Sequence, residues 1–402
     1  MATWPASTRP VVTLGLSQTL AWASSYYLPA MLAVPMARDI GVSTPTVFAA
    51  FSCSIGLSAF VGPWSGKMID RYGGRPVLMG TSIMFAAGLT ALGLAWDTTT
   101  LFLAWLVLGL AMGAGLYEAA FSTIVRLLGA ASRNPITGIT LIAGFASTVG
   151  WPLSSLLEAH LGWRGACFSW AAMHLLIGLP LNFSIPRIAA PAAPGAASTA
   201  PAATPAPPIE PVTRPGLTTA ILAYVFAITW FISTAMAAHL PLLLQAGGAS
   251  AAAAVGIGAL IGPAQVAARL FEASVLRRVH PLLSARLAAI CHPIGAIGLA
   301  TLGAPVAAGF AIIHGAGNGI LTIAKGTLPL ILFGANGYGA RQGWLTMPAR
   351  IAQALAPFAF GLALAHWGAG ALWLSAGLGM SSFIALWFLP TRKPAAQQRT
   401  AG

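Results

Sequence analysis

The chain has 402 residues, of which 57% are hydrophobic and only 7% are charged, and its mean hydropathy is +0.81. These values exclude an ordinary soluble globular domain, in which the charged fraction is about one quarter. The formal net charge is +13 at pH 7, so the positions of the basic residues decide which partner that charge serves.

Twelve apolar stretches follow one another along the chain, and a helix needs about 20 such residues to cross a bilayer. No strand-like alternation competes with them. The sequence therefore predicts an all-α membrane protein with twelve transmembrane helices. The predicted spans are 11–36, 44–65, 77–95, 101–125, 136–159, 166–185, 217–245, 251–273, 287–302, 305–324, 343–365 and 369–389.

The basic residues lie on one side of these spans. With both termini placed in the cytoplasm, sixteen of the 20 Lys and Arg residues fall in cytoplasmic segments, Lys325 among them, and only Arg38 and Arg164 fall in the opposite loops. This is the positive-inside distribution of multi-pass membrane proteins. It predicts a protein of the cell inner membrane with anionic lipid headgroups around its basic surface, and it argues against nucleic-acid binding.

Residues 187–216 are rich in Ala and Pro and nearly lack large apolar side chains, which is typical of an extended linker. This cytoplasmic linker divides the spans six and six. We therefore expect an N-terminal six-helix bundle at 1–186, a C-terminal six-helix bundle at 217–390 and a cytoplasmic tail at 391–402.

Short sequences recur in the same order in both halves. This repetition predicts two pseudo-symmetric six-helix bundles, with a solute site between them near the midplane of the membrane. The recurring pairs are Gly62-Pro63 with Gly262-Pro263, Gly113-Ala114-Gly115 with Gly315-Ala316-Gly317, and Ala159-His160-Leu161-Gly162 with Ala365-His366-Trp367-Gly368.

The segment after the second span, from Gly66 to Arg75, carries the most specific motif in the chain. Its order of Gly, three residues, Asp, Arg, one residue, Gly and further basic residues resembles the loop between the second and third helices of the major facilitator superfamily. The resemblance implies the two-bundle transporter fold and a gate, in which Asp70 and the arginines pair across the cytoplasmic face in one state and separate in another. The gating residues implied are Gly66, Asp70, Arg71, Gly73 and Arg75.

Further stretches resemble the branch of that superfamily that contains monocarboxylate transporters and oxalate:formate antiporters. In that branch an eighth-helix Arg commonly pairs with the carboxylate of the solute, and the resemblance assigns this role to Arg269. The monocarboxylate transporters carry an Asp one turn earlier, which is replaced here by Gln265, so their proton-coupling acid is missing. The motifs typical of drug:proton antiporters are absent from the fourth and fifth spans.

Charged side chains inside the spans need a partner or a function, because burying a charge near a helix centre costs about 2.5–3.5 kcal/mol on insertion scales. Arg269 and Arg350, if both face the centre, form a positive site suited to one or two carboxylates. The alternatives are an ion pair of Arg269 with Glu272 on the same helix and arginines that reach the cytoplasmic surface. Glu118 is a candidate proton carrier, and pairing with an Arg of the other half is its structural alternative.

These observations predict a secondary transporter that carries a small organic anion, such as a carboxylate, by alternating access, with protons as a candidate coupling ion. His239 either contacts the solute or has a hydrogen-bonded packing role. The candidate substrate-binding residues are Arg269, Gln265, Arg350, Tyr27, Tyr117, Trp151 and His239.

We expect a monomer. No cofactor or metal is expected, because the three cysteines lie singly in different spans and no set of metal ligands converges. Two alternatives stay open, namely efflux of a drug-like or conjugated compound and a non-transporting membrane receptor with the same fold. An enzyme is not expected, because the chain lacks a phosphate-binding loop, a His-Glu-x-x-His pair and a Gly-x-Ser-x-Gly elbow.

Overall fold

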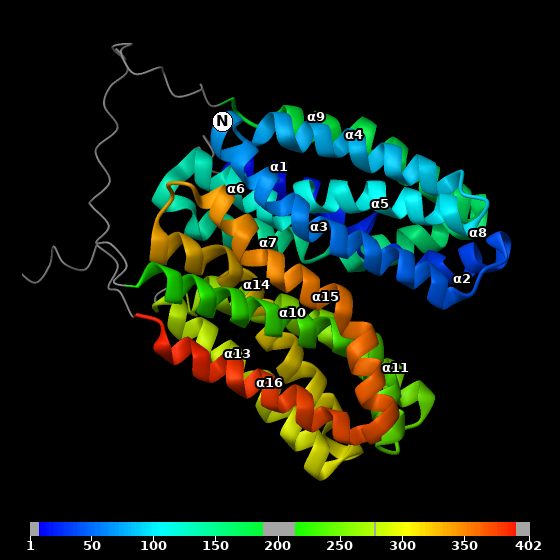
Figure 1. Cartoon of the computed structure of the whole chain (residues 1–402), viewed down its shortest axis with the longest axis vertical. Helices are drawn as coiled ribbons and strands as arrows, with labels where there is room; N and C mark the ends of the chain where they lie inside the picture. The colour runs from blue at the N-terminus through cyan, green and yellow to red at the C-terminus, as the bar shows by residue number, and fades with distance from the viewer. Residues whose placement is uncertain (1–7, 188–213, 277–278, 391–402) are drawn as a thin grey trace, which may run out of the picture.

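A computed structural model describes residues 8–187, 214–276 and 279–390, and within these ranges the chain is helical with no strand (Figure 1). Seven continuous helical segments there are long and apolar enough to cross a membrane, and two of these, of 86 and 51 residues, are longer than a single pass. The all-α prediction is confirmed, and the helices trace twelve passes in two sets of six.

The first six passes use helices that are interrupted at several points. α1 and α2 form the first pass, α3 the second, α4 the third, and α5 and α6 the fourth. α8 turns back on itself at Gly162, whose φ of +68° is accessible mainly to glycine, so it completes the fifth pass begun by α7 and starts the sixth. The bounds are α1 Thr8–Ala23, α2 Pro29–Ile40, α3 Thr44–Tyr72, α4 Gly74–Gly93, α5 Thr98–Gly115, α6 Tyr117–Leu128, η1 Gly129–Ser132, α7 Arg133–Ala143, α8 Ala146–Met173, η2 His174–Gly178 and α9 Leu179–Phe183.

The second six passes repeat this plan with fewer interruptions. The bounds are α10 Pro215–Ala246, α11 Ala251–Ala259, α12 Ile261–Ser274, α13 Pro281–Leu302, η4 Ala304–Val306, α14 Ala307–Phe333, α15 Tyr338–Trp367, η5 Gly368–Gly370, α16 Ala371–Ala385 and η6 Leu386–Phe388. α11 and α12 together form the eighth pass.

The same glycine contact occurs once in each half. A Cβ on Gly109 of α5 would lie 2.6 Å from the carbonyl oxygen of Ser54 on α3, and a Cβ on Gly315 of α14 would lie 2.7 Å from that of Ile261 on α12. Gly113 and Gly319, one turn further along, meet the same partner helices. Small residues at this spacing let two backbones approach closely where no hydrophobic force distinguishes protein from lipid.

Polar side chains, among them Asp97 and Arg164, hold several helix ends in place. Asp97 accepts a hydrogen bond from the backbone N–H of Thr100 at the start of α5, and the bonds from Thr100 hold the pKa of the Asp97 carboxyl below its ordinary value. Arg164 pairs with Asp39 at 2.9 Å and donates to the carbonyls of Gly93 and Ala95, so it ties together α2, α8 and the end of α4.

Three expected boundaries need correction. α14 runs to Phe333 rather than to residue 324, because the apolar sequence continues after Lys325 and its charge is paired inside the protein. α3 runs to Tyr72, so the first part of the predicted gate loop is the end of a helix. α10 begins at Pro215, within the predicted linker 187–216, most of which lies outside the described residues, as does the tail 391–402.

We predict that Gly109→Ala lowers the free energy of unfolding by about 1–3 kcal/mol, because the new methyl group must push α5 away from the Ser54 backbone. The matched control is Gly56→Ala on α3, where a Cβ meets nothing within 4 Å. Unfolding in mixed detergent micelles, followed by helical circular dichroism, measures both. Equal stability of the two variants would show that the close contact does not limit packing.

Candidate functional site

One buried carboxylate lies between two buried cations at the centre of the molecule. Arg350 of α15 donates from Nη2 to Glu118 Oε2 at 2.9 Å, and Lys325 of α14 donates from Nζ to Glu118 Oε1. Arg350 is 5% exposed, Lys325 is 4% exposed and Glu118 is 8% exposed. Since Glu118 belongs to the first half and both cations belong to the second, this ion-pair cluster joins the two halves.

The charges in this region do not balance. Arg269 of α12 is also buried, at 5% exposure, and it reaches across to the first half, where Nη1 donates to the Thr140 carbonyl at 3.3 Å. Its other contact is a long one, from Nη2 to Gln265 Oε1 at 3.5 Å. Arg269 is therefore a third buried cation in this region, and it has no ion-pair partner among the described residues.

Two nitrogen atoms of these guanidinium groups are left without a hydrogen-bond partner in the described part of the chain, namely Arg350 Nη1 and Arg269 Nε. Buried charged groups are normally both paired and hydrogen-bonded, because their desolvation is costly. The centre is thus electropositive and incompletely satisfied, which is a suitable environment for an anion.

Aromatic rings surround the ion-pair cluster. The ring of Trp22 lies 4.9 Å from that of Tyr117 and 5.2 Å from that of Tyr26, and it stacks at 6.4 Å on Trp230 of the other half. Lys325 Nζ lies 4.4 Å from the centre of the Trp230 ring. Arg269 interacts electrostatically with the phenol groups of Tyr27 and Tyr117, so these three predicted residues are brought together.

Breaks in two helices place these side chains. α1 ends at Ala23 and α2 begins at Pro29, and Tyr26 and Tyr27 lie in the turn between them. Leu116, with extended backbone at φ −86° and ψ −162°, separates α5 from α6, so Glu118 lies in the first turn of a new helix. Irregular backbone at this depth is tolerated where it is buried within protein or lines a cavity, which is where transporters place their sites.

The remaining predicted residues have different surroundings. His239 of α10 is hydrogen-bonded through Nε2 to the Pro357 carbonyl of α15 at 2.8 Å. Trp151 is 43% exposed, and its ring lies 6.1 Å from that of Tyr27. Gln265 faces Arg269 from the preceding turn.

The predicted gate residues lie at what we call the basic end, where Arg71, Arg126, Arg133 and Arg341 lie near the helix termini. Asp70 accepts hydrogen bonds from the backbone N–H groups of Gly339 at 2.9 Å and Ala340 at 2.8 Å, in the first turn of α15. A carboxylate at a helix N-terminus is stabilised by unpaired N–H groups and by the helix dipole. Gly66 touches Gly339 closely enough that a methyl group on either would overlap the other's backbone.

The arginines of the motif do not pair with Asp70. The guanidinium of Arg71 lies 5.0 Å from the Tyr72 ring, and that of Arg75 lies 4.0 Å from the Phe183 ring. Gly73 supplies a φ of +81° between α3 and α4. A second contact across the halves at this end joins Arg133 to Glu272 at 3.9 Å, so Glu272 pairs with Arg133 rather than with Arg269.

The contacts between the halves are confined to part of the interface. In the described ranges, the hydrogen bonds and ion pairs across it extend from the basic end to the level of Tyr26, whose hydroxyl accepts from Gln353 at 3.1 Å. Beyond that level, Figure 1 shows α2 and α8 lying apart from α11. The structure is therefore closed at the basic end.

Lys325 is absent from the predicted site, because its position after an apolar run predicts a cytoplasmic charge. The structure corrects this, because Lys325 is buried and paired with Glu118. The apolar run from Gly326 to Phe333 was a usable signal, since a span that continues after a lysine encloses it.

Comparison with known proteins gives a family match and distant relatives. The sequence profile of the Major Facilitator Superfamily matches residues 14–333. The proton myo-inositol cotransporter hmit-1.2 of Caenorhabditis elegans is 28% identical over 156 residues, which are 38% of this chain and 24% of that protein. The purine ribonucleoside efflux pump NepI of Salmonella typhimurium is 28% identical over 169 residues, which are 40% of this chain and 41% of that protein. The matches thus span less than half the length of each relative.

The fold is similar to that of the human organic anion transporter MFSD10 (TETRAN), with a TM-score of 0.71 over 95% of this chain and 100% of that chain. The two sequences are 17% identical, so the likeness shows the fold alone.

We predict that Glu118→Gln lowers the free energy of unfolding by about 3–5 kcal/mol, because it leaves two buried cations without their carboxylate. The double variant Glu118→Gln with Lys325→Met removes one of those cations and should recover part of the loss. Unfolding of the original protein, both single variants, Glu118→Gln and Lys325→Met, and the double variant in mixed micelles gives the coupling energy of the pair. If the double variant is no more stable than Glu118→Gln alone, the loss does not come from unpaired charge.

We predict that Asp70→Asn increases backbone hydrogen exchange at Gly339 and Ala340 and opens the basic end more often, because the cap on α15 loses its charge. Exchange mass spectrometry of peptides around residue 340 measures this. The matched control is Asp97→Asn, which weakens a cap on α5 within one half and should raise exchange only near Thr100. Unchanged exchange near residue 340 in Asp70→Asn would contradict a gating role for the contact.

Proposed function

The chain belongs to the Major Facilitator Superfamily, and from this premise we propose that it is a secondary transporter that moves a small organic anion, such as a carboxylate, across a membrane by alternating access. The basic end faces the cytoplasm in this proposal, as the positive-inside distribution requires, and both termini lie there. The membrane is the cell inner membrane, and the protein acts as a monomer.

The observation that carries the proposal is the unbalanced charge at the centre. Glu118 pairs with two buried cations, Lys325 and Arg350, and the buried Arg269 has no carboxylate partner in the described residues. Arg350 Nη1 and Arg269 Nε have no hydrogen-bond partner there. A carboxylate accepts paired hydrogen bonds from a guanidinium and would supply a negative charge to these groups.

The surroundings of these cations favour an anion with a planar or apolar body. Tyr27 and Tyr117 lie within electrostatic range of Arg269, and Trp22 packs between Tyr117 and Tyr26. Trp230 faces the same region from the other half. Rings in this arrangement offer flat apolar surface beside a fixed positive charge, which suits a carboxylate joined to a ring or a short hydrocarbon.

Transport requires that the site open to each side in turn. In the structure, the basic end is closed by the Asp70 contact with α15 and by the Arg133–Glu272 pair. We therefore take this conformation as the one closed toward the cytoplasm. The opposite conformation would break these contacts and close the halves beyond Tyr26.

Efflux of an uncharged aromatic compound is the second candidate function. The similarity of part of the chain to the purine ribonucleoside efflux pump NepI supports it, as does the aromatic lining, because purine rings stack on Trp and Tyr side chains. In this case the buried cations would serve only the contact between the halves.

Thermal unfolding of the purified protein against a ligand panel distinguishes the candidates, since a ligand that binds only the folded state stabilises it by mass action. The panel contains benzoate and lactate, their uncharged amides, inosine and a lipophilic cation, at constant ionic strength. We expect the melting temperature to rise with carboxylate concentration in the original protein and in Arg286→Gln, whose guanidinium binds the Leu386 carbonyl away from the centre. We expect no rise in Arg269→Gln or Arg350→Gln.

Stabilisation by inosine or the amides alone would replace the anion proposal with the efflux candidate. A carboxylate effect of equal size in Arg269→Gln and in Arg286→Gln would remove Arg269 from the site. Uptake of labelled carboxylate into proteoliposomes then tests transport itself, and binding without uptake would favour a receptor.

A further inference from the structure

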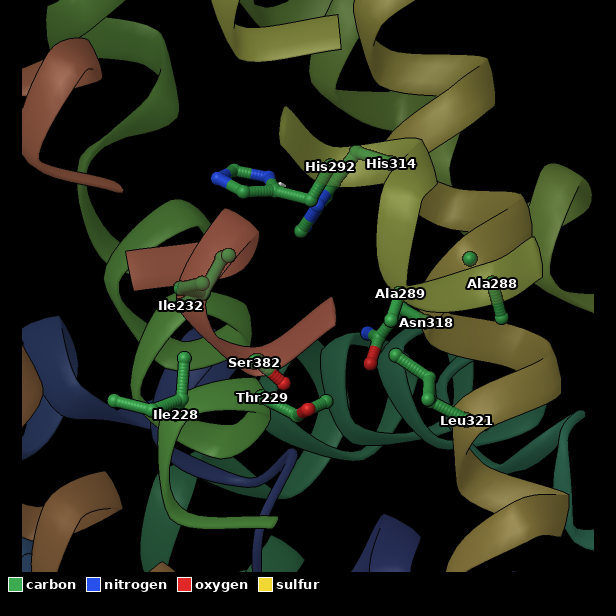
Figure 2. Close-up of a pocket in the computed structure, with 12 residues that line it drawn as sticks. Ile228, Thr229, Ile232, Ala288, Ala289, His292, His314, Asn318, Leu321 and Ser382 are labelled. Atoms are coloured by element: carbon green, nitrogen blue, oxygen red, sulfur yellow. Dashed lines mark hydrogen bonds between the residues drawn. The ribbon is translucent and has the colours of Figure 1, made fainter. Parts of the chain in front are cut away.

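A cavity lies inside the second half, away from the interface between the halves. It has a volume of about 30 Å³ and is lined by residues of α10, α13, α14 and α16. Figure 2 shows two imidazole rings, those of His292 and His314, on one side of it, and the polar groups of Thr229, Asn318 and Ser382 on another.

The two histidines form a direct pair. Nδ1 of His292 lies 3.0 Å from Nδ1 of His314, and the residues are 7% and 4% exposed. A hydrogen bond between two imidazole nitrogens needs one N–H donor and one lone-pair acceptor, so the neutral pair holds one proton between its rings. Each ring keeps its second nitrogen for another partner.

Two buried polar atoms of the cavity wall have no hydrogen-bond partner in the described part of the chain, His292 Nε2 and Ser382 Oγ. Buried polar atoms without a protein partner usually bind water, and a cavity of about 30 Å³ has room for a water molecule beside these two atoms. The cavity therefore offers the pair both a free ring nitrogen and a place for the water that would deliver a proton.

A second, smaller cavity of about 10 Å³ lies beside the first, on the side of Lys325. It shares Thr229, Asn318 and Leu321 with the first cavity, and Lys325 also lines it. On α14, His314, Asn318 and Lys325 follow at spacings of four and seven residues, which places them on one face of the helix. His314, Asn318 and Lys325 thus form a row of polar side chains between the histidine pair and Glu118.

No other titratable or charged side chain lines the first cavity. On the surrounding helices, Tyr224 bonds to Ser381 and His239 to Pro357, and α16 carries no such group in the described residues. The others are Arg286 and Cys291 on α13, Lys325 on α14, and Arg269 and Glu272 on α12, which packs on α14.

We propose that the His292–His314 pair is a proton-binding site that couples protonation to events at the centre. The neutral pair takes one proton from cavity water at a ring nitrogen, and its charge changes from zero to +1 with no other bond made or broken. The added charge acts on Lys325 through the shared polar wall at Thr229 and Asn318. Glu118, held by two cations, does not need to carry the proton. The coupling to transport rests on the proposed function, whereas the proton site does not.

The first test observes the pair directly. The chain has 7 histidines, so ¹⁵N-histidine spectra of the original protein in lipid nanodiscs can be assigned with one His→Gln variant at a time. We expect two rings joined by a shared Nδ1 proton that together take up one further proton as the pH is lowered from about 8 to 4. His292→Gln and His314→Gln should each abolish this joint titration, whereas His366→Gln, at the end of α15, should leave it unchanged.

Two rings that stay neutral over this range, or that titrate independently, would overturn the proposal. Because a His variant can fail to fold, Ser382→Ala and Asn318→Leu provide a second comparison with both rings in place. We expect each to shift the midpoint of the joint titration, since each changes what the cavity offers to water. An unchanged midpoint in both would contradict a role for the cavity.

The second test uses proteoliposomes and the carboxylate that stabilises the protein. We expect a pH gradient to drive its accumulation in the original protein and not in His292→Gln or His314→Gln, while exchange of labelled for unlabelled carboxylate continues in all three. Accumulation that survives in both variants would overturn the coupling. If no carboxylate is exchanged by any protein, the proposed function fails, and the spectra still decide on the proton site.

Discussion

The ion pairs of Glu118 with Lys325 and Arg350 are the interaction on which the rest of this structure depends. They lie at the centre of the interface, with partners from both halves, and all three residues are more than nine-tenths buried. Charges in such surroundings attract strongly and tolerate separation poorly, so the cluster both holds the halves together and fixes their register. Its stoichiometry matters as much as its strength, because two cations on one carboxylate leave positive charge over.

A helix break and a close glycine contact position the helices that carry this cluster. Leu116 interrupts the fourth pass directly before Tyr117 and Glu118, so the carboxylate projects from the start of a new helix. Gly66 and Gly339 let α3 and α15 meet at the basic end, and the cap that Asp70 places on α15 lies on the same contact. α15 also carries Arg350, so one continuous helix connects the basic end with the centre.

The sequence was sufficient for the twelve passes and the all-α architecture, because each pass leaves a run of apolar residues that no other fold requires. It was insufficient for the cluster. Lys325 follows an apolar run, so the sequence predicts a cytoplasmic position for it. Composition alone does not reveal that its partner is Glu118, which lies 207 residues away in the chain. Likewise, the alternatives for Glu118 could not be separated without knowing which helices of the second half face it. The bond between Asp70 and the backbone of α15 was also out of reach, because a helix N-terminus has no side chain to mark it as a partner.

The two halves share a backbone plan but divide the chemistry unequally, and this division has a mechanical consequence. Gly109 on α5 and Gly315 on α14 make the same helix contact in each half, yet the first half supplies the carboxylate and most of the aromatic rings at the centre, whereas the second supplies the cations and Trp230. In the proposed function, an anion would bind the excess cations without first displacing Glu118. The proposed proton site at His292 and His314 lies within the second half, so its geometry need not change when the halves separate. Only its charge changes, and Lys325 is the residue through which that change reaches the interface.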